Sequence, residues 1–104
     1  RAVPRYNVRG VAKAALDSSM RYLAADLGAK NIRVNAISAG PVRTLAARSI
    51  PGYTTMEEIV ADRAPLKRNI DATDVARCAA YMLDAENVSG TISYVDAGYH
   101  AMGM

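Results

Sequence analysis

The stretch Tyr6-Asn7-Val8-Arg9-Gly10-Val11-Ala12-Lys13 opens the longest helical run in the chain. Asn7 is a suitable N-cap, and Gly28 is well placed to end a helix. Between them apolar residues recur at helical spacing, which predicts a helix from Asn7 to Leu27. The expected core face of this helix comprises Val8, Val11, Ala12, Ala15, Leu16, Ser19, Leu23 and Leu27.

Tyr6 and Lys13 fall outside that apolar arc. Their separation is nearly two helical turns, so the phenol and the ammonium share one face, about 10 Å apart along the axis. Gly10 lies between them, and because glycine inside a helix costs roughly 1 kcal/mol relative to alanine, it indicates a close approach to the backbone. The pattern predicts a ligand along this face, held by Lys13 and meeting Tyr6 at its reactive end. A half-buried tyrosine and a solvated lysine without a ligand would give the same sequence, so the choice between the two interpretations depends on the rest of the chain.

Length and composition limit the possible functions. The chain has 104 residues, a formal net charge of +3 and one cysteine, Cys78, so it holds one domain or less and no intramolecular disulfide. The charge is too diffuse for a nucleic-acid partner, and no apolar run is long enough to span a membrane. We expect a cytoplasmic protein without a metal site, in which His100 is a structural or surface residue. The absence of an initiator methionine and a leader predicts that Arg1 begins a fragment.

A strand is predicted after the long helix. Ile32 to Ser38 is short, largely apolar and rich in branched residues, which is typical of a buried strand, and a loop follows at Ala39-Gly40-Pro41. Ligands of α/β sheets bind outside the carboxyl ends of the strands. We therefore expect Gly40 to Thr44 to lie at a ligand.

Residues 43 to 64 are expected to form an irregular helical region. Leu45-Ala46-Ala47 starts a short helix, Pro51-Gly52 breaks it, and Thr55 caps a second helical segment. A broken apolar region of this kind suits a mobile flap over the substrate, although an ordinary helical crossover has the same pattern.

The last third of the chain supplies a helix and a second strand. Asp71 or Thr73 caps a helix that runs to about Asp84, and Thr91 to Val95 reads as a strand closed by Asp96-Ala97-Gly98. A helical connection between two strands indicates a parallel crossover, but two parallel strands alone are not a stable sheet. We therefore predict an α/β fold, the C-terminal part of a doubly wound parallel sheet, in the order long helix, strand, helical flap, helix and strand.

Three segments together carry a family resemblance: Tyr6-x6-Lys13, Ile32 to Ala47, and Val95-Asp96-Ala97-Gly98-Tyr99. They closely resemble the bacterial enoyl-acyl carrier protein reductases of the FabI type, in the short-chain dehydrogenase/reductase superfamily. Ordinary members of that superfamily place the lysine four residues after the tyrosine, where this sequence has Gly10. The resemblance implies that residues 1–104 are the C-terminal part of one NAD(P)-binding Rossmann-like domain, lacking its N-terminal cofactor-binding half. Alone, this chain is then expected to be inactive.

The resemblance implies reduction of the 2,3 double bond of an enoyl thioester on acyl carrier protein, with NADH or NADPH, in type II fatty acid synthesis. Tyr6 would stabilise the enolate formed when hydride reaches the β-carbon. Val42 would meet the nicotinamide carboxamide, and Thr44 would lie near the pyrophosphate. The implied cofactor-binding residues are Lys13, Gly40, Pro41, Val42 and Thr44. The implied substrate pocket is formed by Tyr6, Arg9, Ala46, Ala47, Ile50, Tyr53 and Met56.

Two positions depart from the family. Arg9 stands where methionine is common, so either the pocket wall differs or Arg9 turns to solvent, and Tyr53 stands where phenylalanine is frequent. Two other functions stay open: a short-chain reductase acting on a carbonyl, which the Tyr-to-Lys spacing disfavours, and a non-catalytic remnant or scaffold subunit. We expect a homotetramer with no nucleic-acid or membrane partner. The acidic carrier protein is expected to meet Arg43, Arg48 and Lys67.

Overall fold

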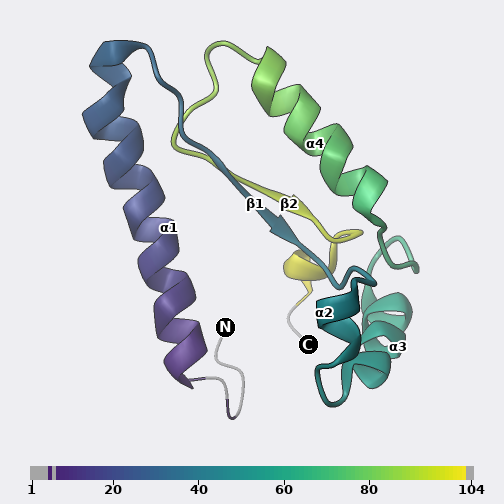
Figure 1. The fold of residues 1–104 in the computed structure, drawn as a ribbon. Coiled ribbons are helices and arrows are strands. Elements are labelled where there is room, and N and C mark those ends of the chain that lie inside the picture. Colours follow the sequence, from purple (N-terminus) through teal and green to yellow (C-terminus); the bar gives the residue numbers. More distant parts are fainter. Residues whose placement is uncertain (1–4, 6, 103–104) are drawn as a thin grey trace. The chain divides into compact units, whose positions relative to one another are not determined.

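The computed structural model describes Arg5 and residues 7–102. Its elements are α1 (Asn7–Leu27), the 3-10 helix η1 (Gly28–Lys30), β1 (Ala36–Ala39), α2 (Leu45–Arg48), α3 (Tyr53–Arg63), α4 (Ala72–Asp84), β2 (Ile92–Val95) and the 3-10 helix η2 (Tyr99–Ala101). β1 pairs with β2 (Figure 1). The predicted α/β order is confirmed. None of the described helices is both long and apolar enough to cross a membrane.

The chain divides into two compact units. The first contains Arg1–Ala36 and Ala85–Ile92, and the second contains Ile37–Asp84 and Ser93–Met104. The long helix α1 belongs to the first unit, whereas α2, α3 and α4 belong to the second.

Helix α1 ends at Leu27 as predicted, and the predicted N-cap Asn7 is its first residue. Near its start the Asn7 side-chain oxygen accepts a hydrogen bond of 3.0 Å from the Val8 amide. After Leu27 the chain tightens into η1, and Asn31, at φ 60°, adopts the left-handed conformation that ends the turn. The helix therefore stops where Gly28 predicts, but the residue that reverses the chain is Asn31, which tolerates this conformation better than most residues.

The predicted core face of α1 is wrong for this chain. Val8 is 79% exposed and Val11 72% exposed, whereas Met20 is buried and Ala24 is half-buried. A Cβ placed on Gly90 would lie 3.7 Å from the Ala24 Cβ, so the segment after α4 approaches this side of the helix. The helix contacts the rest of its unit through the side that carries Met20 and Ala24. Within the described residues the larger apolar side chains of the other arc stay open to solvent.

The strand β1 begins four residues later than the predicted strand at Ile32. Before the strand begins, the Asn35 side chain bonds to the facing segment: its Nδ2 donates to the Val88 carbonyl at 2.8 Å, and its Oδ1 accepts from the Thr91 amide at 3.1 Å. A backbone bond from the Gly90 amide to the Val34 carbonyl at 2.8 Å accompanies them. Regular strand pairing starts only at Ala36.

The two strands are parallel. The Ala36 amide donates to the Thr91 carbonyl at 2.9 Å, and the Gly40 amide donates to the Val95 carbonyl at 2.9 Å. A step of four residues on one strand thus matches a step of four in the same direction on the other, which confirms the crossover prediction. Ser38 and Ala39 are exposed, so the expected buried strand is only partly covered by the two-stranded sheet.

Side-chain and glycine caps set the helix starts in the second unit. Thr44 caps α2, its Oγ1 accepting from the Ala47 amide at 3.0 Å. Gly52, at φ 78°, is the N-cap of α3, so the prediction that Thr55 caps this helix is wrong. Glycine takes this conformation at little cost, which allows α3 to begin directly after the Pro51 turn.

Helix α4 begins with a reciprocal pair of carboxylate caps. The Asp74 amide donates to Asp71 Oδ1 at 3.0 Å, and the Asp71 amide donates to Asp74 Oδ2 at 2.9 Å. Of the two predicted caps, Asp71 is confirmed, and Thr73 lies inside the helix. Two otherwise orphan amides are satisfied in this way.

The core of the second unit lies where the end of α3 meets the turn after β2. Val60, Ala64 and Ala97 form its buried cluster, and Ile70 and Tyr99 pack against it. The Leu66 amide donates to the Ala97 carbonyl at 3.2 Å. The turn after β2 is therefore held against the end of α3.

We expect Gly98→Ala to destabilise the fold strongly. Gly98 has φ 86°, and a Cβ there would lie 3.0 Å from the Pro65 Cγ, so the variant combines backbone strain with a clash. Urea unfolding of the complete protein should show a loss of about 2 kcal/mol or more. Gly28→Ala is the control, because a Cβ at Gly28 meets nothing within 4 Å. Equal losses for both variants would contradict this explanation.

Candidate functional site

Two predicted site residues, Arg9 and Lys13, lie on α1. Tyr6 lies outside the described residues. Lys13 and Arg9 are exposed side chains of α1, and Gly10 between them is half-buried. Within the described part of the chain Lys13 forms no ion pair, so its ammonium is available to a ligand.

Gly40 permits a close backbone approach at the carboxyl ends of the two strands. A Cβ at this position would lie 3.2 Å from the Asp96 Cβ and 3.3 Å from the Asp96 Cα. Such contacts are too tight for most side chains, so a larger residue would push the two strand ends apart. The structure thus supplies a packing reason for a glycine that sequence reasoning assigned to ligand binding.

The next predicted residues continue from this contact. Pro41 and Val42 are half-buried, and Thr44 is exposed at the start of α2. The Thr44 oxygen accepts from the Ala47 amide at 3.0 Å, which leaves the hydroxyl proton free to donate to an anionic oxygen. A hydroxyl in this state is one of the donors that bind phosphate oxygens in proteins.

An ion pair joins this segment to α3. The Arg43 Nε–H is shared between Glu57 Oε1 at 2.9 Å and Oε2 at 3.1 Å. The Arg43 side chain is 69% exposed, whereas that of Glu57 is 10% exposed. Hydrogen bonding and charge from Arg43 hold the pKa of Glu57 below its usual range, so this carboxylate stays ionised at neutral pH.

Tyr53 lies one helical turn before Glu57 on the buried face of α3. It is 7% exposed, and its hydroxyl has no hydrogen-bond partner among the described residues. Burial, the Glu57 charge and hydrogen bonding to Glu57 raise the pKa of Tyr53, so its hydroxyl lies close to that carboxylate although the contact is poorly aligned for a hydrogen bond. Tyr53 is therefore a neutral phenol beside the Glu57 carboxylate.

Two concave regions adjoin the Arg43–Glu57 pair. One, of about 290 Å³, is lined by Arg43, Arg48, Tyr53, Thr54 and Glu57. The other, of about 560 Å³, is lined by Val42, Arg43, Glu57 and residues 69–73. The structure thus brings predicted cofactor residue Val42 and predicted pocket residue Tyr53 to the same ion pair.

The remaining predicted pocket residues lie on or between α2 and α3. Ala47 is half-buried, whereas Ala46, Ile50 and Met56 are exposed. None of the four lines either cavity beside Arg43.

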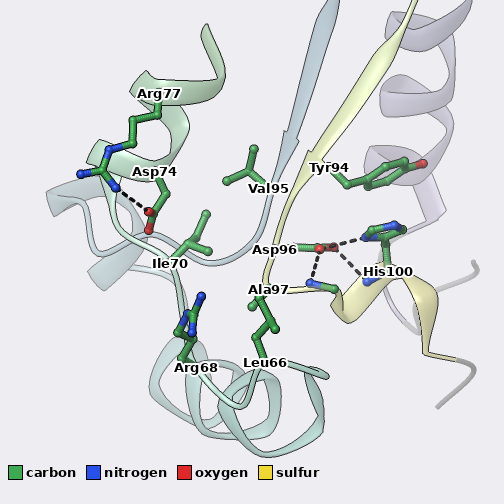
Figure 2. Close-up of a pocket in the computed structure, with 11 residues that line it drawn as sticks. Leu66, Arg68, Ile70, Asp74, Arg77, Tyr94, Val95, Asp96, Ala97 and His100 are labelled. Atoms are coloured by element: carbon green, nitrogen blue, oxygen red, sulfur yellow. Dashed lines mark hydrogen bonds and ion pairs between the residues drawn. The ribbon is translucent and has the colours of Figure 1, made fainter. Parts of the chain in front are cut away.

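A separate concavity of about 340 Å³ lies around the turn after β2 (Figure 2). Asp96 accepts hydrogen bonds there from the Gly98 amide at 3.0 Å and the His100 amide at 2.9 Å, and its Oδ1 lies 2.9 Å from His100 Nδ1. The His100 ring stacks on Tyr94 at 4.1 Å between centroids. Asp96 therefore closes the turn, and none of the predicted site residues lines this concavity.

Sequence reasoning missed Glu57 and Asn69. Asn69 Nδ2 donates to the Glu57 carbonyl at 3.0 Å, and its Oδ1 is buried without a partner among the described residues. The available signal was a carboxylate at helical spacing from the apolar residues Tyr53 and Val60. Its partner Arg43 is 14 residues away, beyond what helical spacing can identify.

The chain is similar to a well-defined family of proteins. A family model described as enoyl-(acyl carrier protein) reductase matches residues 1–100. The NADPH-dependent enoyl-acyl carrier protein reductase FabI of Staphylococcus aureus strain MRSA252 is 52% identical over 103 residues, which are 97% of this chain and 40% of that protein. The NADH-dependent FabI of Nostoc sp. is 53% identical over 106 residues, covering 100% of this chain and 41% of the relative.

Solved structures agree with these relatives. The crystal structure of the Bacillus cereus enoyl-acyl carrier protein reductase with NADP+ and indole naphthyridinone has a TM-score of 0.93 and 45% sequence identity. That match covers 100% of this chain and 41% of the other. The chain thus spans about 40% of the length of the curated relatives it matches. The predicted Rossmann-like context of the two strands is confirmed by this likeness.

Proposed function

Because this chain belongs to the enoyl-(acyl carrier protein) reductase family, we propose that the complete protein reduces the 2,3 double bond of an enoyl thioester on acyl carrier protein. The observation that carries the proposal is the exposed Lys13 on α1, which forms no ion pair with the described residues and lies seven positions after Tyr6 in the sequence. The relatives named above use NADPH or NADH, and we propose one of these two cofactors here.

We propose Lys13 and Gly40 to Thr44 as the residues that bind the dinucleotide. Lys13 would hold the ribose hydroxyls, and the free Thr44 hydroxyl proton would donate to the pyrophosphate. Gly40 and Pro41 would shape the segment that leads to Thr44, and the Val42 backbone would contact the nicotinamide carboxamide of the cofactor. Bound NADH or NADPH would supply the hydride that adds to the β-carbon of the substrate.

Tyr6 would act on the thioester end of the substrate. Hydride addition leaves negative charge on the thioester oxygen, and a phenol hydroxyl is a suitable hydrogen-bond donor to that oxygen. The positive charge of Lys13 would favour this donation. The family likeness of residues 1–100 supports the role of Tyr6, which lies outside the described residues.

The acyl chain would bind in the region of α2 and α3, residues 43 to 64. We propose Arg9, Ala46, Ala47, Ile50, Tyr53 and Met56 as its contacts. The exposed apolar arc of α1 supports a further covering surface, and we propose a homotetramer in the cytoplasm.

The reaction is tested with two thioesters. With NADH or NADPH, the complete protein should consume cofactor with crotonyl thioester at least about tenfold faster than with acetoacetyl thioester, because the family position of Tyr6 suits an enolate. Spectrophotometric turnover measures both rates. A preference for acetoacetyl thioester would instead identify a carbonyl reductase. A protein that binds neither cofactor at millimolar concentration would be the scaffold alternative.

We expect Lys13→Ala to weaken cofactor binding without disturbing the fold. A charged hydrogen bond is worth about 1.5–3 kcal/mol, so the Kd should rise roughly tenfold to a hundredfold. Because Lys13 is exposed, the midpoint of thermal unfolding without cofactor should stay near that of the wild type. Fluorescence titration and calorimetry measure the two quantities. A large fall in that midpoint would show that Lys13 serves the fold.

Docking of the carrier protein is tested at Arg48. Arg43 and Lys67 were also expected to take part, but each has a structural contact that its substitution would remove. Arg43 pairs with Glu57, and Lys67 Nζ donates to the Asp62 carbonyl at 2.6 Å. Arg48→Glu should raise the KM for carrier-bound substrate by roughly threefold, with a smaller effect on a coenzyme A thioester. Arg77→Glu on α4 is the matched control. Equal effects on both substrates would remove the docking role.

A further inference from the structure

Arg43 occupies a special place in the second unit. It lies between Val42 and Thr44, which the proposed function assigns to the cofactor, and its side chain reaches Glu57 on α3. Glu57 lies one turn after Tyr53, which the proposed function assigns to the acyl chain. One ion pair therefore connects the segment for one reactant to the helix for the other.

The carboxylate is the anchored partner of this pair. Glu57 is buried in α3 between Tyr53 and Val60, and its backbone carbonyl accepts from Asn69 Nδ2 at 3.0 Å. Arg43 is mostly exposed and follows a loop, so its position depends on the carboxylate that it contacts. A buried carboxylate tolerates little movement away from its cation, because an unpaired charge in such a place is costly.

The phenol beside the pair offers a second partner. The Tyr53 hydroxyl is buried and has no hydrogen-bond partner among the described residues, and burial and the Glu57 charge raise its pKa. A small movement of the Tyr53 side chain would let it donate to the same carboxylate. A ligand that moves the Tyr53 side chain would then change the hydrogen bonding of the Glu57 carboxylate.

We propose that the Arg43–Glu57 pair is a positioning device that couples the Val42–Thr44 segment to α3. In this arrangement Glu57 touches neither reactant and acts through Arg43. The inference rests on the proposed function, because Val42 and Thr44 are cofactor residues only under it. It adds two positioning residues, Arg43 and Glu57, whose effect is on cofactor affinity.

The experiment measures cofactor Kd and thermal unfolding in the complete protein. NADH and NADPH are each titrated into the wild type, and the one that binds is used for the variants Glu57→Gln, Arg43→Gln and the double variant. Each single variant should raise the Kd about tenfold, as expected for contacting charges. The Kd of the double variant should not exceed the higher of the two single-variant Kd values, because both changes break the same pair.

Two further variants separate positioning from fold stability. Glu58→Gln removes the same charge from an exposed position of α3 and should leave the Kd unchanged. Arg43→Lys keeps the charge but loses the shared Nε–H contact, and its Kd should lie between those of the wild type and Arg43→Gln. If a single variant does not fold, Arg43→Lys and the double variant carry the same comparison.

The outcomes are distinct. A Kd within twofold of the wild type in the folded variants, even with a lower unfolding midpoint, would overturn the positioning role and leave the proposed function intact. An equal rise in Glu58→Gln would also overturn it, since charge alone would then be responsible. A wild type that binds neither cofactor would overturn the proposed function and this inference together.

Discussion

The close contact between Gly40 and Asp96 determines the arrangement of the second unit. Gly40 donates its amide to the Val95 carbonyl at 2.9 Å, and its missing side chain leaves room for the Asp96 backbone. Both strands therefore end at one place, from which one loop leads to α2 and the other, closed by the Asp96 carboxylate, leads to η2. The two loops that leave this end of the sheet therefore start next to one another.

Two polar side chains, Arg43 and Thr44, follow β1 at this end of the sheet. Thr44 caps α2 with its oxygen and keeps its proton, while Arg43 turns to a carboxylate buried in α3. An ionised carboxylate in such a place must be paired, so Glu57 restricts where Arg43 can lie. Packing of Val60 and Ala64 against Ala97 holds α3 itself to the turn after β2. The ion pair therefore joins the segment after β1 to α3, and the apolar cluster joins α3 to the turn after β2.

Local patterns were sufficient where one residue type has one physical role. The helix between Asn7 and Leu27, the break at Pro51-Gly52 and the cap at Asp71 were all predictable, because capping and turn preferences act over a few residues. Patterns failed where a distant segment competes. Asn35 binds the facing segment through its side chain before β1 begins, and α1 buries Met20, which lies outside the predicted apolar arc.

The sequence by itself determined the order of the elements, the parallel α/β class and the family, since these depend on periodicity, caps and motif spacing. It also identified Lys13 and Gly40 to Thr44 as candidates. Only the tertiary structure decided that Gly40 is required by the backbone of Asp96 and that Arg43 is held by Glu57. The physical reason is that steric fit and charge pairing across many residues depend on distances that no local pattern contains.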